Sequence, residues 1–204
     1  MANRTKCSEL EQPVTSETAC GFVLEFADII TTVQMNSNTN TNVGGWPSTT
    51  MIKYLNETDE NDDTDGVIYN ALPEKLKDEI IETKVISSKG GNNDAGPLNG
   101  NYESRDKLYL LSPEEVWGTS FTSSYDSSRG TSRQLDYYED NKVTTTANKS
   151  YAIKKYQGSA SNWWLRSARS TSSYNFYNVS NAGTSSNTNA DNSNGVSPAF
   201  RLGE

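Results

Sequence analysis

The sequence predicts an α+β fold, and three observations support this. Short apolar segments of the kind that form strands are spread along the whole chain. Three helix starts lie between them, and long stretches rich in Gly, Asn, Ser and Asp separate the segments as loops do. A chain of 204 residues suits one hydrophobic core. We therefore expect one main domain with two or more short helices and long loops.

The first strand is expected within residues 21–33. Phe22, Leu24 and Phe26 alternate there with other residues, which favours a strand, or a strand and a turn, that feeds the core. Residues 36–45 then have the composition of a loop.

Two helices are expected next. Ser48 or Thr49 can cap the first, which would run to residue 55. The second is expected over residues 73–83, where Leu76, Ile80 and Ile81 would share one helical face.

The middle of the chain predicts two further strands and a helix start. Residues 85–86 are expected in a strand, residues 89–101 in a loop and residues 108–111 in a buried strand. A helix should begin at Ser112, because Pro113 then occupies the first helical position. The polar residues 118–132 follow.

Residues 167–194 form a tract of unusual composition. Of its 28 residues, 18 are Ser, Thr or Asn, and Lys, Glu, Gln, Met and Trp do not occur. Every residue in the tract can arise from an AAC or AAT asparagine codon by changes at its adenines. The alternative is a general low-complexity bias, which would indicate a linker or a disordered tail.

The tract is bracketed by two apolar, strand-like motifs, WWLRS (163–167) and GVSPAFRL (195–202). Exposing such motifs to water is costly. Phe176 and Val179 lie inside the tract among small polar residues, as in a partly buried segment. We therefore expect an ordered surface.

These motifs resemble the variable region of proteins diversified by diversity-generating retroelements, in which error-prone reverse transcription alters template adenines. The resemblance continues upstream through FADI (26–29), QMN (34–36), GGW (44–46), YLN (54–56), ALP (71–73), DKLYLLS (106–112) and RQLDYY (133–138). It covers most of residues 20–202.

The resemblance implies a C-type lectin fold with a small antiparallel sheet, similar to the formylglycine-generating enzymes. Residues 1–20 would be an N-terminal arm or truncated appendage, and residues 21–204 the lectin-like domain with a variable region at about 162–194. Proteins of this family bind ligands on phage tails or cell surfaces. We accordingly expect display on a virion tail or on a bacterial surface, and an unknown protein or glycan ligand.

Diversification is tolerable only at positions that contribute little to the core. The expected constant residues are Trp163, Trp164, Leu165, Phe176, Val179, Gly183, Gly195, Val196, Pro198, Ala199 and Phe200, with Arg166 and Arg201 also part of the scaffold. The expected ligand-binding residues, all predicted to be exposed, are Arg169, Ser170, Thr171, Ser172, Ser173, Tyr174, Tyr177, Ser180, Ala182, Thr184, Ser185, Ser186, Thr188 and Asp191. Among them, Arg169, Tyr174 and Tyr177 are the predicted anchors, since Tyr and Arg dominate binding hot spots.

The net charge and the hydropathy of the chain limit the kinds of partner that we expect. The net charge is −8, and no basic run is longer than Lys154-Lys155, whereas a nucleic-acid site needs a basic stripe. No apolar run is long enough to span a membrane, and the first residues do not form a secretory signal. We expect neither nucleic-acid binding nor membrane insertion.

Cys7 and Cys20 leave two readings open. In an oxidising compartment they would close a short loop as a disulfide, and otherwise they are two free thiols in a loose arm. The chain contains no His, so an ordinary zinc ligand set is missing. We expect no cofactor.

An acidic run at residues 57–65 suggests calcium. NDDTDG (61–66) matches the first half of a calcium loop, but its twelfth position is Leu72 rather than the bidentate Glu that closes such a loop. A solvated acidic loop is the favoured interpretation.

Catalysis is not expected. The cysteines lie outside the C-terminal core where the formylglycine-generating enzymes carry theirs, and the commonest general base, His, is absent. Asp136 and Glu139 form a carboxylate pair, but such pairs at helical spacing are usually solvated. The alternative to a ligand-binding protein is a structural virion or cell-surface protein whose Ser/Asn-rich tract is only a decorated loop.

Overall fold

The computed structural model describes residues 1–10, 14–56, 65–91 and 101–202. Its largest sheet has the strand order β2-β10-β7-β8-β9, and neighbouring strands are antiparallel except for β10 and β7. The strands are β2 Thr31–Gln34, β7 Trp163–Ala168, β8 Asn175–Val179, β9 Ser185–Asn189 and β10 Ser193–Val196.

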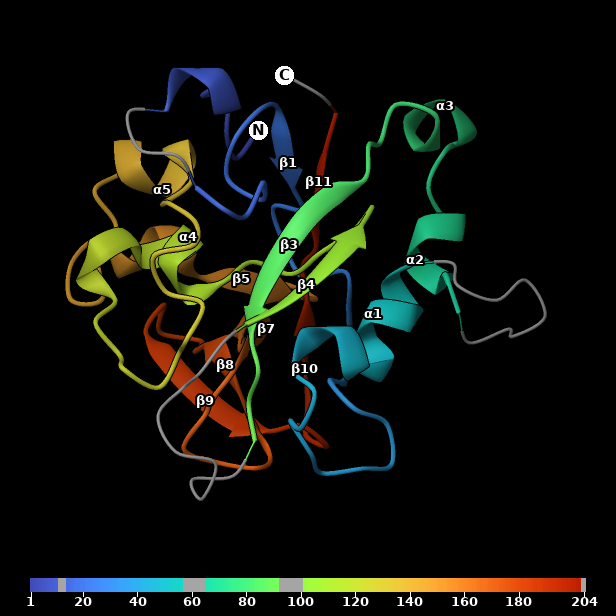
Figure 1. Cartoon of the computed structure of the whole chain (residues 1–204), viewed down its shortest axis with the longest axis vertical. Coiled ribbons are helices and arrows are strands. Elements are labelled where there is room, and N and C mark those ends of the chain that lie inside the picture. The colour runs from blue at the N-terminus through green and yellow to red at the C-terminus, as the bar shows by residue number, and fades with distance from the viewer. Residues whose placement is uncertain (11–13, 57–64, 92–100, 203–204) are drawn as a thin grey trace.

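Three antiparallel ladders and several short helices surround this sheet (Figure 1). The ladders pair β1 Val23–Glu25 with β11 Ala199–Arg201, β3 Thr83–Ser88 with β4 Asn101–Asp106, and β5 Lys154–Tyr156 with β6 Ser159–Ser161. The α-helices are α1 Thr50–Leu55, α2 Val67–Asn70, α3 Glu74–Lys77, α4 Pro113–Trp117 and α5 Asp136–Asp140, and the 3-10 helices are η1 Cys7–Glu9, η2 Trp46–Ser48, η4 Gly118–Ser120 and η5 Lys149–Ala152. The fold is thus a mixed α/β one of small sheets and short helices, as an α+β prediction requires.

Figure 1 shows how the elements are arranged. Helices α1, α2 and α3 lie on one side of the strands and α4 and α5 on the other. The N-terminus lies beside β1, whereas most of β9 lies at the opposite end of the molecule.

The predicted helix caps are confirmed. The side chain of Thr49 accepts a hydrogen bond from the Ile52 N–H and starts α1. Ser112 and Glu115 form a capping box at α4, with Pro113 in the first turn. Each cap satisfies backbone N–H groups that a helix leaves without intrahelical partners.

The prediction of one helix over residues 73–83 is wrong in its length. Helix α3 ends at Lys77, and the Ile81 N–H donates to the Arg201 carbonyl at 3.0 Å in an isolated bridge. Ile80 is buried while Ile81 is 37% exposed, so they do not share a buried face. Pairing with the C-terminal strand outweighs the local helical pattern here.

Other elements depart from expectation as well. Residues 108–111 are fully buried as predicted, but they make only an isolated bridge between Tyr109 and Ala199 rather than a strand ladder. Helix α2 and strand β4 were not predicted. Strand β4 carries mostly polar side chains, and its register against β3 comes from tertiary pairing.

The motifs that bracket the tract build the centre of the core. Every residue expected to be constant is buried, including Arg166, Arg201 and Pro198. The two tryptophans project to opposite faces of β7, and each indole N–H donates to a carbonyl: Trp163 to Ala152 at 3.0 Å and Trp164 to Val33 at 3.0 Å. Both faces of the sheet are therefore covered, which explains the unbroken apolar run.

The N-terminal residues are fastened to the domain. Cys7 and Cys20 form a disulfide, so of the two readings the bridge is the one the structure contains. The Ala2 N–H donates to the Val23 carbonyl at 2.9 Å, and Ala19 and Cys20 are fully buried. The described residues of this segment thus pack on the same core as the rest of the chain.

We expect the disulfide to contribute about 2–3 kcal/mol to the free energy of unfolding, because it closes a loop between residues 13 apart. Urea unfolding of the wild type with and without reductant should show this loss. A Cys7→Ala/Cys20→Ala variant should unfold at the reduced midpoint, and reductant should leave it unchanged. Equal midpoints for oxidised and reduced wild type would contradict the expectation.

In the parts of the chain that the structure describes, no helix is both long enough and apolar enough to cross a membrane.

Candidate ligand-binding surface

The Ser/Asn-rich tract folds into the end of β7, strands β8 and β9, the start of β10 and the turns between them. Strand β9 is at the edge of the five-stranded sheet, and all five of its side chains are half-buried. The tract is therefore an ordered part of the sheet with polar side chains reaching solvent.

The structure divides the predicted ligand-binding residues between two ends of β8. At one end the Ala190 N–H donates to the Tyr174 carbonyl at 2.8 Å, which joins residues 169–174 to residues 188–191. At the other end the Ser180 N–H donates to the Thr184 carbonyl at 2.8 Å. The five residues of β8 hold these ends about 13–17 Å apart. The predicted ligand-binding residues thus fall into two groups. The group at the first end consists of Arg169, Thr171, Ser172, Ser173, Tyr174, Thr188 and Asp191. The group at the second end consists of Ser180, Ala182, Thr184 and Ser185, and Ser186 lies between the two.

The turn at the second end depends on Gly183. Its φ is +74°, and a Cβ atom there would lie 2.0 Å from the Lys149 carbonyl oxygen. Only glycine fits this position, as expected of a constant residue.

Two of the residues predicted to be exposed are buried. Tyr177 is 4% exposed: its ring meets that of Phe121 edge-on at 5.3 Å, and its hydroxyl lies 2.7 Å from that of Ser123. Burial raises the pKa of Tyr177 despite the Ser123 hydrogen bond. Ser170 is 7% exposed, and its hydroxyl donates to the Tyr125 carbonyl. Tyr177 and Ser170 are thus scaffold residues, and the prediction of Tyr177 as an exposed anchor is wrong.

The aromatic partner of Arg169 comes from outside the tract. The Arg169 guanidinium lies 5.1 Å from the centre of the Tyr125 ring, and it donates to Asn187 Oδ1 at 3.3 Å. Asn175 donates to the same oxygen at 2.6 Å. Tyr125 and Tyr174 are 42% and 45% exposed, so they are the large aromatic side chains offered at this end. The sequence pattern contained no signal for Tyr125, which lies in the polar stretch 118–132.

Asn42 holds the loop of residues 169–175 in place. Its side chain is fully buried, and its amide nitrogen donates to the carbonyls of Arg169, Ser172 and Asn175 at 2.9, 2.8 and 2.8 Å. Its backbone N–H donates to the Ser173 carbonyl at 2.8 Å, and its Oδ1 accepts from the Gly91 N–H at 2.9 Å. These bonds reach only main-chain atoms of the loop, so they do not depend on which side chains the loop carries.

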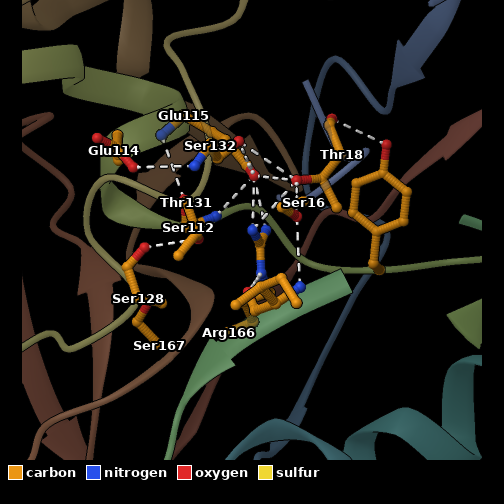
Figure 2. Close-up of polar contacts among 12 residues, drawn as sticks. Ser16, Thr18, Ser112, Glu114, Glu115, Ser128, Thr131, Ser132, Arg166 and Ser167 are labelled. Carbon is orange, nitrogen blue, oxygen red and sulfur yellow. Dashed lines mark hydrogen bonds and ion pairs between the residues drawn. The ribbon is translucent and has the colours of Figure 1, made fainter. Parts of the chain in front are cut away.

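A buried polar cluster fastens the start of the tract to the rest of the chain (Figure 2). Arg166 on β7 makes two parallel hydrogen bonds of 2.6 Å to the Glu115 carboxylate on α4. Thr18 from the N-terminal segment donates to the same carboxylate, as does Ser132 at 2.9 Å. The remaining Arg166 donors reach the carbonyls of Ile86 and Leu110 and the Thr18 hydroxyl. The cluster thus joins five separate segments of the chain through charge-assisted bonds.

The carboxylate pair Asp136 and Glu139 is occupied by structural contacts. Asp136 accepts hydrogen bonds from the backbone N–H groups of Arg4 and Thr5 and from the Arg133 guanidinium. Burial raises the pKa of Asp136, but these donors outweigh it and hold the pKa below its usual value. Glu139 pairs with Arg133 at 2.6 Å. Asp136 thus anchors the N-terminal segment to α5, whereas Glu139 is 59% exposed and stays largely in solvent, as expected of it.

The candidate calcium-loop residues 61–64 lie outside the described residues. Within the described ranges, no three His, Cys, Asp or Glu side chains gather as metal ligands would.

Comparison with protein families identifies the domain to which most of the chain belongs. The model of a domain of unknown function, DUF6273, matches residues 22–203 of the chain. No match was found among curated proteins or among solved structures.

Proposed function

Since the chain belongs to the DUF6273 family, whose description assigns no activity, we propose from the surface itself that it is a non-enzymatic ligand-binding protein. Its fold would be of the C-type lectin type, and its ligand a protein or glycan on a target surface. The residues that vary would be those of the tract, through adenine-directed retroelement mutagenesis. The protein would be displayed on a virion tail or a bacterial surface and would bind neither nucleic acid nor membranes.

The observation that carries this proposal is that the residues that hold the tract in place differ from the residues whose side chains the tract exposes. Asn42 holds residues 169–175 by their carbonyls, and the constant residues that flank the tract are buried. Side chains such as Ser173 and Tyr174 can then change with little cost, because most surface substitutions alter stability by less than about 0.5 kcal/mol. A binding surface built for diversification needs this independence.

The surface chemistry also suits recognition. Tyr174, Tyr125 and Arg169 offer aromatic and cationic contact area, and the surrounding Ser, Thr and Asn side chains offer both donors and acceptors. Ser and Thr dominate this copy of the tract, which favours a shallow site. Burial of Tyr177 leaves fewer anchors than the sequence suggested.

The test is the DNA that encodes residues 163–202. The proposal requires a near-identical repeat nearby, next to a reverse transcriptase gene, with mismatches confined to template adenines. The mismatched codons should encode solvent-facing residues such as Ser173 and Tyr174 and should spare Gly183. No such repeat, or mismatches spread over all four bases, would refute retroelement diversification and favour the structural virion or cell-surface protein.

A further inference from the structure

A pocket lies outside the tract, between α5, η5 and β1. It has a volume of about 240 Å³, and none of its lining residues belongs to residues 162–194. Diversification of the tract would therefore leave every side chain that lines this pocket unchanged.

The floor of the pocket is a buried ion pair. The Lys154 ammonium lies 2.8 Å from a carboxylate oxygen of Glu25, and their side chains are only 5% and 7% exposed. The Tyr138 hydroxyl donates to the same carboxylate at 3.0 Å. Lys154 also donates to the Phe26 carbonyl and lies 5.0 Å from the centre of the Trp163 ring. A buried ion pair usually stabilises a fold no more than well-packed apolar side chains of the same size would. Stability alone therefore does not explain why this pair lies at the floor of a pocket, and a role in binding would explain it.

The two charged groups at the floor of the pocket differ in how many further hydrogen bonds they can make. The Lys154 ammonium is already surrounded by the Glu25 carboxylate, a carbonyl and an aromatic ring. An ionised carboxylate can accept about four hydrogen bonds, and within the described residues Glu25 has donors only from Lys154 and Tyr138. The floor can thus accept a further hydrogen bond from a ligand, while its net charge is zero.

The rim of the pocket is aromatic and open to solvent. Tyr137 and Tyr151 are 41% and 46% exposed, and their rings meet at 6.5 Å in a T-shaped pair. Phe26 completes the wall. Aromatic side chains of this kind offer large apolar faces with a polar end in water. A pocket with such walls and a few convergent polar groups has the usual anatomy of a small-molecule site.

We propose that this pocket binds a single neutral sugar ring, such as the terminal pyranose of a glycan, and that it does so in every diversified copy. The apolar face of the ring packs on Tyr151 and Tyr137, and a ring hydroxyl donates to Glu25. A cation would approach Lys154 and an anion Glu25, so the charge-compensated floor selects against both. At about 240 Å³ the pocket is below the roughly 300–1,000 Å³ of sites for larger ligands, which limits the occupant to about one ring.

The probes are the methyl pyranosides of glucose, galactose and N-acetylglucosamine, titrated through the millimolar range into the full chain. Amide chemical shifts should move saturably for at least one glycoside, and the shifts should cluster around Tyr137, Tyr151 and Glu25. Tyr151→Ala should weaken this binding at least tenfold, because the stacking ring is removed. Tyr151→Phe, which keeps the ring, should bind as the wild type does.

Tyr102→Ala is the matched control, since Tyr102 is 36% exposed but lies on β4, outside both the tract and the lining of this pocket. It should leave glycoside binding unchanged, and circular dichroism should show all three variants folded. The proposal is overturned if no glycoside binds saturably, if Tyr151→Ala binds as tightly as the wild type, or if tetramethylammonium or acetate produces the same shifts more strongly. These outcomes are independent of the DNA repeat, so this inference and the proposed function fail separately.

Discussion

Replacing Glu115 by Ala is expected to lower the free energy of unfolding by about 3–5 kcal/mol, because it leaves the Arg166 guanidinium buried without its counter-charge. Both side chains are at most 1% exposed, and two hydrogen bonds of 2.6 Å join them. The loss should be larger than an exposed ion pair could cause. Urea unfolding at neutral pH measures it directly.

The matched control is Glu139→Ala. Glu139 also pairs with an arginine, Arg133, at 2.6 Å, but its side chain is 59% exposed. Solvent screens such a pair, and its loss should cost no more than about 1 kcal/mol. If the two variants lose equal stability, burial does not determine the strength of the Arg166–Glu115 pair, and the expectation is wrong.

The same pair predicts a pH dependence. Burial raises the pKa of Glu115, but the charge and hydrogen bonds of Arg166, with those of Thr18 and Ser112, outweigh it and hold the pKa below 4.5. The unfolded chain therefore takes up this proton more readily than the folded one, so the stabilisation is complete above about pH 4.5 and is lost as the pH falls further. The stability difference between the wild type and Glu115→Ala should shrink below this pH. A difference that stays constant from pH 6 to pH 3 would contradict the assignment.

Replacing Asn42 by Ala is expected to cost about 1–3 kcal/mol and to loosen the loop of residues 169–175. The change removes the amide donor to three carbonyls. The carbonyls of Arg169 and Asn175 keep a backbone N–H donor, but among the described residues the Ser172 carbonyl has no other donor, and a buried acceptor left without a partner costs about 1–3 kcal/mol. Amide hydrogen exchange should accelerate at Arg169, whose N–H donates to the Asn175 carbonyl, and at Ala190, whose N–H donates to that of Tyr174. Denaturant unfolding measures the accompanying loss of stability.

Two further variants distinguish the contribution of the Asn42 side chain from that of the side chains of residues 169–175. Asn42→Asp keeps the size and the acceptor for Gly91 but removes the donor, so it should lose at least as much stability as Asn42→Ala. Ser173→Ala alters a loop side chain but keeps the Ser173 carbonyl bond to Asn42, and its effect should stay within about 0.5 kcal/mol. If Ser173→Ala is as damaging as Asn42→Ala, the loop depends on its side chains, and the surface is not suited to diversification.

Local patterns were sufficient for the elements whose cause is local. The caps of α1 and α4 were predictable because Thr49 and Ser112 bond within three residues of their own positions. The apolar motifs around the tract were predictable as core strands because few other places accommodate two adjacent tryptophans. Helix α3 was predicted too long because Ile81 pairs with Arg201, a residue 120 positions away along the chain.

For the candidate site, the sequence determined the tract, its buried frame and its polar chemistry, because codon-restricted composition and apolar spacing are local properties. Only the tertiary structure decided that Tyr177 packs on Phe121, that Tyr125 stands beside Arg169, and that Asn42 holds the loop from 127 residues away. It also decided that Glu25 and Lys154 meet beneath two tyrosines. These contacts join segments far apart in the chain, and their geometry depends on how the sheets and helices pack. Residue periodicity does not encode that packing, because it reports only which face of an element is buried and not what lies against it.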